Sequence, residues 1–239
     1  MKTTFVYDHY FLYEEIMEQC NYYVNTYPQL VSMETLCMTQ ENRPVVALTL
    51  TNQNTGYQKP GFYIDANHHA GEVTGSMVAM HTMDTLLTNY GSDENITKIL
   101  DTTMVYIIPR VSPDGSQTYL TTPFGLRSVN REYLKSDKGL KQNDVDEDGS
   151  IRMMRVKSPY GAWKKHPSDP KLVELRKPDE TEGEFYNVYM EGTMDGFDGL
   201  HIDSTNPDWG LDFNRNYPFG WFPEHRQPGA GKSPLSNPE

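Results

Sequence analysis

The sequence predicts an α/β fold, from two apolar strands and a helical segment that lies between them. Residues 61–66 and 104–108 are short apolar stretches with the length and composition of strands. Apolar side chains recur at helical spacing over residues 73–87: Val73, Met77, Met80, Met83 and Leu87. The order strand, loop, helix, strand is the βαβ pattern of a sheet with helices packed against it.

Two further elements are predicted before this unit. A helix is predicted over residues 9–27, where apolar or aromatic residues share one stripe: Leu12, Ile16, Cys20, Tyr23 and Tyr27. Pro28 ends this helix, because proline cannot continue the hydrogen-bond pattern of a helix. Residues 45–51 are β-branched and apolar, which predicts a strand, and Pro109 stops the later strand at residue 108.

The composition changes from about residue 130 to residue 207. This segment is charged, rich in Gly, Pro and Asp, and poor in long periodic apolar runs. We interpret it as a surface insertion within a single domain that spans residues 1–239, since a chain of this length holds one sizeable core. After it, residues 211–213 look like a return to the sheet, and residues 218–239 contain five prolines and no strong element.

Charge and composition narrow the classes of function. The net charge is −12, from 21 Lys and Arg against 33 Asp and Glu, which argues against nucleic acid or an anionic membrane surface as partner. No apolar run approaches the length that spans a bilayer, and no signal peptide is visible at the start. The two cysteines exclude a disulfide framework but leave one bridge open.

His69 and Glu72 form a His-x-x-Glu pair at the carboxyl end of the strand at residues 61–66. A neutral imidazole and a carboxylate three residues apart can face one divalent cation, and zinc takes such ligands at catalytic sites. In α/β sheets, ligands bind beyond the carboxyl ends of strands. The alternative is a chance pair on a solvated helix face, and the pair alone does not decide between the two.

Three further segments carry polar side chains of interest. Pro113-Asp114-Gly115 follows the strand at residues 104–108 and is a turn signal, for which a simple turn is sufficient explanation. In Asn214-Arg215-Asn216, a guanidinium flanked by amides can hold a carboxylate bidentately, although an ordinary surface arginine is the alternative. Arg127 lies twelve residues past Gly115, and Arg131 is close behind it.

His-x-x-Glu, Pro-Asp-Gly and Asp-x-Asn-Arg-Asn occur here in the order in which zinc carboxypeptidases carry them, and the chain resembles that family. The opening helix followed by Tyr27-Pro28-Gln29-Leu30-Val31, and the Glu41-Asn42-Arg43-Pro44 turn, also resemble the family's start. The resemblance covers residues 8–128 and about 208–239, and the segment between them looks like the insertion of a bacterial subgroup. It implies the amino-terminal portion of a three-layer α/β/α fold with a mixed, mainly parallel sheet.

The resemblance implies hydrolysis of C-terminal peptide bonds, with peptide or protein C-termini as substrate and Zn²⁺ as cofactor. His69 and Glu72 match the first two zinc ligands. Arg127 is the best match, by a gapless count from Pro-Asp-Gly, to the arginine that polarises the scissile carbonyl. Asn214 and Arg215 match the pair that binds the substrate's C-terminal carboxylate. Zinc then serves as Lewis acid and activates water, and a secreted or periplasmic location is implied.

Two parts of the family's catalytic set have no match in the sequence: a third zinc ligand, which is a later histidine, and a glutamate general base. Only His225 follows Asn214, and it comes too soon, within a Pro-rich loop. Either the chain is the front part of a longer enzyme, or the protein has lost its catalytic half. Residues 236–239, Ser-Asn-Pro-Glu, are a helix-start signal and favour the first explanation.

We therefore expect these 239 residues alone to hold zinc poorly and to hydrolyse no peptide detectably. Loss of a partner of a metal-bound histidine already costs about 10–100-fold in metal affinity or activity. Loss of a general base forfeits about 10²–10⁴-fold more in rate.

A second metal site is predicted in the insertion. Asp144, Asp146 and Asp148, followed by Gly149, match the first half of a calcium loop, in which alternate carboxylates turn towards one hard cation. The twelfth position is Arg155 and not glutamate, so a complete EF-hand is excluded. The missing oxygens could come from a second acidic segment, at Asp195 and Asp198. The alternative is a solvated acidic loop.

Two other functions stay open on the sequence. One is a zinc amidohydrolase of the aspartoacylase or succinylglutamate-desuccinylase type, which shares His-x-x-Glu and Asn-Arg but fits Pro-Asp-Gly and the long opening helix less well. The other is a non-catalytic protein that uses Asn214 and Arg215 to hold carboxylate-terminated peptides while the insertion binds calcium.

Overall fold

The computed structural model divides the chain into two compact units. The residues that it describes are 5–122, 127–128, 139–198, 202, 212–228, 230 and 232–235. The first unit comprises residues 1–121, 126–132 and 208–239, and the second comprises residues 122–125 and 133–207. Each unit is described by itself.

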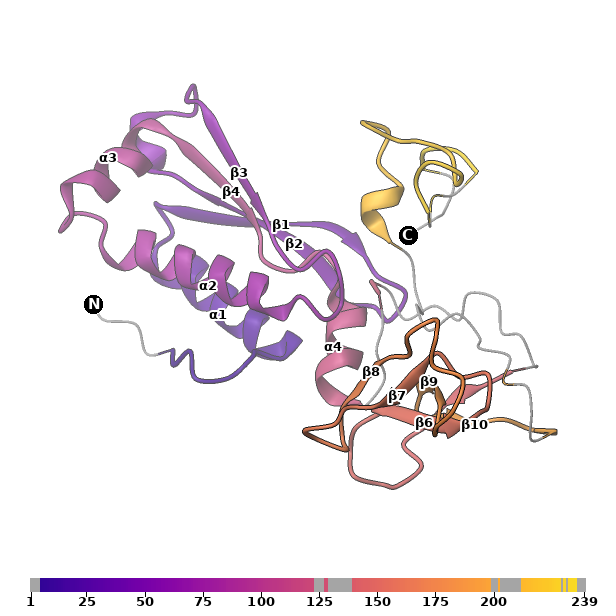
Figure 1. The fold of residues 1–239 in the computed structure, drawn as a ribbon. Coiled ribbons are helices and arrows are strands. Elements are labelled where there is room, and N and C mark those ends of the chain that lie inside the picture. Colours follow the sequence, from indigo (N-terminus) through magenta and orange to yellow (C-terminus); the bar gives the residue numbers. More distant parts are fainter. Residues whose placement is uncertain are drawn as a thin grey trace. The chain divides into compact units, whose positions relative to one another are not determined.

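The first unit is built on a four-stranded sheet with the order β1-β2-β4-β3 (Figure 1). Its strands are β1 (Val31–Met38), β2 (Pro44–Leu50), β3 (Gly61–Asp65) and β4 (Met104–Ile108). The predicted strands at β2, β3 and β4 are confirmed, each within one residue at either end.

The sheet is mixed, as predicted, but among the described strands it is not mainly parallel. β1 and β4 both pair with β2 in antiparallel register, and only β3 and β4 run parallel. The reason is the length of the connections. A tight turn joins β1 to β2, which permits only an antiparallel pair, whereas a helical crossover joins β3 to β4. Asn42 adopts a positive φ of 59° in that turn.

Helices pack against one face of this sheet, which confirms the α/β class (Figure 1). They include α1 (Tyr13–Thr26), which begins four residues later than predicted, and α2 (Val73–Thr88), which covers the predicted residues. The shared core contains buried residues from both helices and from alternate positions of β2 and β4: Ile16, Cys20, Tyr23, Met80, Met83, Leu87, Val46, Leu48, Leu50, Val105 and Ile107. Each large apolar side chain buried in this way contributes about 1.5–3 kcal/mol to stability.

The parallel pair brings two chain segments together at one edge of the sheet. Asp65, at the end of β3, lies opposite Ile108, at the end of β4. Beyond the strands, the amide of Val111 donates to the carbonyl of Ala66 at 2.9 Å, and the amide of Ser112 donates to the carbonyl of Asn67 at 3.1 Å. The loops that follow β3 and β4 are therefore bound to each other where the predicted site lies.

Other elements differ from the predictions. Pro113-Asp114-Gly115 is not an isolated turn but the first turn of α4 (Pro113–Thr121). Proline is favoured there because the first amides of a helix have no carbonyl partner within the helix, so a missing N–H breaks no helical hydrogen bond. Phe213 begins the short 3-10 helix η2 (Phe213–Arg215) and is not in a strand, and Leu211 lies outside the described residues. The structure adds α3 (Glu94–Thr102), β1 and the 3-10 helix η1 (Gln53–Thr55).

The second unit contains strands that the sequence did not predict. A four-stranded sheet has the order β6-β9-β7-β8, with β6 (Met153–Lys157), β7 (Trp163–Lys165), β8 (Val173–Leu175) and β9 (Tyr186–Met190). Two short strands, β5 (Lys141–Gln142) and β10 (Gly192–Thr193), form a separate pair. Among the described residues of the second unit, the buried apolar ones are Leu140, Phe185 and Tyr186. That this segment is an insertion within a peptidase domain stays a prediction.

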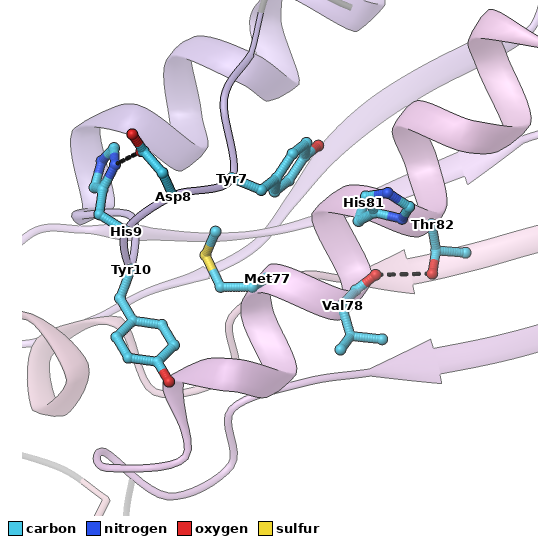
Figure 2. Close-up of a pocket in the computed structure, with 8 residues that line it drawn as sticks. All are labelled: Tyr7, Asp8, His9, Tyr10, Met77, Val78, His81 and Thr82. Atoms are coloured by element: carbon cyan, nitrogen blue, oxygen red, sulfur yellow. Dashed lines mark hydrogen bonds and ion pairs between the residues drawn. The ribbon is translucent and has the colours of Figure 1, made fainter.

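An open groove of about 700 Å³ lies between the N-terminal segment and α2 (Figure 2). Its lining is Tyr7, Asp8, His9, Tyr10, Met77, Val78, His81 and Thr82. The His81 ring meets the Tyr7 ring edge-on, with 5.2 Å between centroids.

Cys20 is buried and Cys37 exposed, and both are free thiols, which settles the disulfide question left open by the sequence. Across the described residues, no helix has the length and apolar character needed to cross a membrane.

Candidate metal and substrate site

The loop after β3 places His69 and Glu72 on one turn of chain. The amide of Glu72 donates to the carbonyl of His69 at 3.0 Å, and Glu72 is the residue that precedes α2. The amide of Ala70 donates to the carbonyl of Arg127 at 2.7 Å, which fixes the middle of the loop. Both predicted ligands are therefore held at the carboxyl end of β3, where the sequence placed them.

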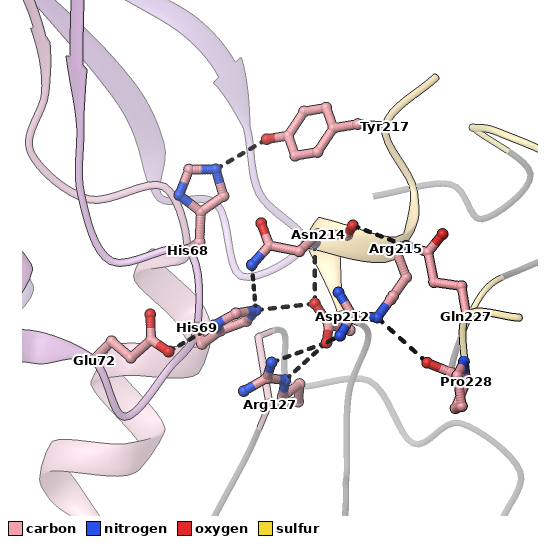
Figure 3. Close-up of polar contacts among 10 residues, drawn as sticks. All are labelled: His68, His69, Glu72, Arg127, Asp212, Asn214, Arg215, Tyr217, Gln227 and Pro228. Carbon is pink, nitrogen blue, oxygen red and sulfur yellow. Dashed lines mark hydrogen bonds and ion pairs between the residues drawn. The ribbon is translucent and has the colours of Figure 1, made fainter. Parts of the chain in front are cut away.

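The two side chains point towards each other (Figure 3). Nδ1 of His69 lies 2.8 Å from Oε1 of Glu72. The His69 side chain is 6% exposed and the Glu72 side chain 61% exposed, so a buried ring meets a carboxylate open to solvent. His68 is turned away, with Nε2 3.0 Å from the Tyr217 hydroxyl, and stays a neighbour and not a ligand.

Asp212 holds the other side of the His69 ring. Its Oδ1 lies 3.0 Å from Nε2 of His69. A carboxylate only accepts hydrogen bonds, and Glu72 on the Nδ1 side is a carboxylate too, so either ring nitrogen of His69 can carry the proton. In the tautomer with the proton on Nε2, Nδ1 and Oε1 of Glu72 are two electron-pair donors at close range, an arrangement that a metal ion between them stabilises. The donor set, one nitrogen and one oxygen, fits zinc, and metal-bound histidines commonly donate their second N–H to a carboxylate.

Arg127 shares the same carboxylate. Its Nη2 and Nε donate to Oδ2 of Asp212 at 2.9 and 3.2 Å (Figure 3). Burial raises the pKa of Asp212, but the hydrogen bonds from Arg127 and His69 outweigh this, and the net pKa is lower than that of an ordinary aspartate. Asp212 is therefore ionised at neutral pH and orients both partners.

The predicted substrate-binding pair lies on η2, beside this carboxylate. Nδ2 of Asn214 is 3.4 Å from Nε2 of His69, and the backbone amide of Asn214 donates to Oδ1 of Asp212 at 3.0 Å. Nη2 of Arg215 is 4.0 Å from Oδ2 of Asp212, and its Nε donates to the carbonyl of Pro228 at 3.3 Å. The structure thus brings all five predicted residues of the first unit together.

The sequence reasoning gave no role to Asp212, although it is the first residue of the Asp-x-Asn-Arg-Asn motif. That position was the available signal. Arg131, the other candidate for the arginine role, lies outside the described residues, as does the helix-start signal at residues 236–239. Within the described ranges, His69 and Glu72 belong to no group of three metal donors.

The acidic loop of the second unit has a different set of neighbours from the predicted one. Asp144, Asp146 and Glu191 each place a carboxylate oxygen within 4.8 Å of the others. Oδ2 of Asp148 instead pairs with Nε of Arg152 at 2.8 Å, and Oδ2 of Asp195 with Nζ of Lys141 at 3.2 Å. Glu191 was not predicted, because it lies 45 residues after Asp146 and the two segments meet only in the folded chain, beside the β5–β10 pair.

Comparison with known proteins decides the family. The model of the zinc carboxypeptidase family matches residues 16–239. The chain belongs to the zinc carboxypeptidase family. This confirms the resemblance seen in the sequence, and zinc is the metal that membership implies. Which residues of this zinc carboxypeptidase chain bind it stays a prediction.

Individual relatives match parts of the chain. Carboxypeptidase A2 of Mus musculus is 34% identical over 113 residues, which are 47% of this chain and 26% of the relative. Carboxypeptidase D of Homo sapiens is 27% identical over 96 residues, which are 39% of this chain and 7% of that protein. The chain therefore spans about a quarter or less of the length of these relatives.

Two solved structures are similar over part of this zinc carboxypeptidase chain. A metallo-carboxypeptidase from Burkholderia cenocepacia is 30% identical with a TM-score of 0.37, covering 43% of this chain and 28% of that one. Bovine thrombin-activatable fibrinolysis inhibitor, solved in complex with tick carboxypeptidase inhibitor, is 21% identical with a TM-score of 0.46, covering 54% and 40%.

Proposed function

We propose that this chain provides the zinc-binding and carboxylate-binding residues of a metallocarboxypeptidase, which hydrolyses C-terminal peptide bonds. The observation that supports it best is the convergence of Nδ1 of His69 on Oε1 of Glu72, 2.8 Å apart, with Asp212 on the far ring nitrogen. Family membership supports the same conclusion.

In this proposal His69 and Glu72 hold the zinc ion. When bound, zinc supplies Lewis-acid activation to the reaction. Asp212 keeps the proton on Nε2 of His69, so that Nδ1 offers its lone pair to the metal. Because the Glu72 side chain is 61% exposed, its carboxylate can adjust to the metal without disturbing the core.

Arg215 and Asn214 bind the C-terminal carboxylate of the peptide. The Arg215 guanidinium is 36% exposed and, at 4.0 Å, is only loosely paired with Asp212, so it is available for a bidentate contact with an incoming carboxylate. Arg127 points its guanidinium to the same carboxylate of Asp212 and, in this proposal, polarises the scissile carbonyl.

Catalytic zinc sites take three protein ligands, and the described residues supply two at this site. We therefore propose that the 239-residue chain alone binds zinc weakly and hydrolyses peptides below detection. Stoichiometric zinc after dialysis together with carboxypeptidase turnover would refute this part of the proposal.

Zinc binding is tested by titrating the chain with Zn²⁺ or Co²⁺. His69→Ala and Glu72→Ala are expected to abolish the binding, whereas His68→Ala, which removes the adjacent ring, leaves it unchanged. If His68→Ala and His69→Ala behaved alike, the assignment of the ligand would be wrong.

Carboxylate binding is tested without any need for turnover. A peptide with a free C-terminus is compared with the same peptide carrying a C-terminal amide. The free carboxylate is expected to bind more tightly, and Arg215→Ala to remove the difference. Arg226→Ala is the matched control, since that arginine stacks on the Phe222 ring, with its guanidinium carbon 4.1 Å from the ring centroid. Equal binding of both peptides contradicts the proposed role.

The amidohydrolase alternative uses the same zinc pair on a different substrate. N-acyl amino acids present an amide and a carboxylate without a peptide chain, so they separate the two classes. Preferential binding or cleavage of N-acyl amino acids over C-terminal peptides would favour the alternative.

We also propose that the second unit binds a calcium ion, through Asp144, Asp146 and Glu191. The oxygens of these three residues lie within 4.8 Å of one another, and oxygen ligands of this kind suit Ca²⁺. The pKa of Glu191 is lower than usual because the amides of Arg152, Val145 and Asp146 donate to its carboxylate. Asp148, predicted as a third ligand from the loop, pairs with Arg152 through Oδ2 and accepts from the Ser150 amide through Oδ1.

Calorimetric titration with Ca²⁺ and limited proteolysis test this second site. Calcium is expected to protect the loop from cleavage, and Asp144→Asn or Glu191→Gln to remove the protection. Asp169→Asn, in a different loop of the same unit, serves as control. If protease resistance is the same with and without calcium, the loop is a solvated acidic segment.

A secreted or periplasmic location is proposed from family resemblance alone. Cell fractionation with an antibody against the chain tests it, and recovery in the cytosol would overturn it.

A further inference from the structure

Asn67 stands at the start of the loop that carries His69, and its backbone adopts an uncommon conformation. Its φ is 61°, in the left-handed region that residues other than glycine seldom occupy. Asparagine tolerates this region better than most residues, because its short side chain can hydrogen-bond locally. The residue is 4% exposed, so its side-chain amide must find partners inside the protein.

The Asn67 amide reaches directly to the backbone of His69. Its Nδ2 donates to the carbonyl of His69 at 2.6 Å. A carbonyl can only accept, so the nitrogen must face His69, and the orientation of the amide follows. The oxygen then faces two buried hydroxyls, those of Ser116 at 2.7 Å and Ser76 at 3.1 Å.

These partners belong to three different parts of the first unit. Ser76 lies in α2 and Ser116 in α4, and both are fully buried. The Asn67 carbonyl also accepts from the amide of Ser112, in the loop after β4. The Ser76 hydroxyl accepts in turn from Nε of the buried Arg110, at 3.1 Å. One residue thus ties the loop to two helices and to the neighbouring loop.

We propose that Asn67 is a positioning residue, whose amide locks the loop in the conformation that directs His69 and Glu72 to a single metal ion. This inference rests on the proposed zinc site and deepens it. The Nδ2 bond fixes the His69 carbonyl, while Asp212 fixes the far ring nitrogen of His69. The backbone and the ring of His69 are then each held by one contact, which leaves Nδ1 facing Glu72.

Asparagine meets requirements at this position that glycine, aspartate and alanine do not. Glycine permits the positive φ but offers no side-chain hydrogen bond. Aspartate has the right shape, but an oxygen would replace Nδ2 and face the His69 carbonyl, and a charge would be buried. Alanine lacks the bonds and is strained at this φ.

The test compares Asn67→Gly and Asn67→Asp with Asn42→Gly in the 239-residue chain. Asn42 is the matched control because it has nearly the same φ, 59°, but an exposed side chain in the β1–β2 turn. Three quantities are measured at fixed pH: the Zn²⁺ affinity, the ¹⁵N signals of the His69 ring in the metal-free chain, and the denaturant midpoint of unfolding.

Asn67→Gly is expected to weaken Zn²⁺ binding about 10-fold or more, within the range seen when a supporting hydrogen bond of a metal-bound histidine is lost. In the metal-free chain its His69 ring signals broaden or split, because Nδ1 no longer has one direction. Asn67→Asp shows the same changes more strongly, whereas Asn42→Gly leaves affinity and ring signals as in the parent.

A purely structural role would lower the unfolding midpoint while leaving the ring signals and the affinity unchanged, and that result would overturn the inference. If the parent chain itself binds no zinc through His69, the proposed function fails separately. The ring signals of the metal-free variants then still decide whether Asn67 positions the ring.

Discussion

Oδ1 of Asp212 lies 3.0 Å from Nε2 of His69, although the two residues are 143 positions apart in the sequence. The same carboxylate accepts from Arg127 through Oδ2, at 2.9 Å from Nη2. A single acid therefore orients the proposed zinc ligand and the proposed catalytic arginine. Its lowered pKa keeps it ionised, so both contacts are charge-assisted at neutral pH.

Asp212→Asn is expected to weaken Zn²⁺ binding about 10–100-fold with the fold intact, because the neutral amide accepts more weakly from His69. The amide also offers no charge to Arg127. Competition with a chromophoric chelator measures the affinity, and circular dichroism checks the fold. Asp169→Asn, in the second unit, is the control for a lost aspartate charge. An unchanged affinity would mean that Asp212 does not orient the metal-binding ring.

Gly115→Ala is expected to displace the segment at residues 127–128. A Cβ at Gly115 would collide with the backbone carbonyl of Ser128. A backbone atom, unlike the end of a flexible side chain, cannot move aside without shifting the chain. The displacement would weaken the bond from the Ala70 amide to the Arg127 carbonyl, and the cost in stability should be about 1–3 kcal/mol. Chemical denaturation measures it.

Gly61→Ala is the matched control for this change. A Cβ there meets only the end of the Tyr106 side chain, at 3.1 Å, which can move aside. Equal unfolding free energies for the two variants would show that Gly115 is not required for the close approach of Ser128.

The sequence predicted the central fold because its signals are local. The apolar runs of β2, β3 and β4 and the stripe of α2 each reveal themselves within a few residues. β1 was missed because only its first residue, Val31, is buried, and the rest of the strand shows no regular alternation of polar and apolar residues. α4 was missed because Pro-Asp-Gly is typical of a turn and gives no sign that a helix continues from it.

The candidate site also contains residues that the sequence predicted and residues that it did not. His69 and Glu72 are three residues apart, so their pairing could be predicted from spacing alone. The roles of Asp212 and Glu191 depend on contacts between distant segments. The motif Asp-x-Asn-Arg-Asn marked Asp212 as a candidate but gave no sign of its partners. Asn67 was missed for a different reason: nothing in Ala66-Asn67-His68 indicates a left-handed backbone or a buried amide.

The hydrogen bonds around His9 predict a pH dependence of the N-terminal segment. The bond to Asp8 and then that to Glu15, at 2.8 and 2.9 Å, raise the pKa of His9 above its usual value. A raised pKa stabilises the folded state at pH values below the unfolded pKa, about 6.5. That stabilisation is lost as the pH rises through the folded-state pKa.

We therefore expect amide exchange at Leu12 to accelerate between pH 6 and 8 beyond the intrinsic rate, because the Leu12 amide donates to the same Glu15 carboxylate at 2.7 Å. The interval brackets the usual histidine value of about 6.5. His9→Asn should abolish this excess, whereas His166→Asn, in the second unit, should retain it. A pH-independent excess in the parent chain would count against the role of His9.

Asp114 connects the first turn of α4 to the β1–β2 turn and predicts a loss of stability when removed. Its Oδ1 accepts from Nη1 of Arg43 at 2.8 Å and from the Thr39 hydroxyl at 2.9 Å, and its Oδ2 accepts from the Glu41 amide at 3.2 Å. The Asp114 side chain is 6% exposed and that of Arg43 20% exposed, so removal of the acid leaves a partly buried charge without this partner.

Asp114→Ala should lower the free energy of unfolding by about 1–3 kcal/mol, the usual cost of leaving buried hydrogen-bonding groups unsatisfied. Glu41→Ala, which removes the more exposed of the two acids near Arg43, should cost under about 1 kcal/mol. A double-mutant cycle with Arg43→Ala isolates the ion pair, since part of the loss in Asp114→Ala should vanish when Arg43 is already absent. Strict additivity in that cycle would show that Asp114 stabilises the turn through Thr39 and Glu41 alone.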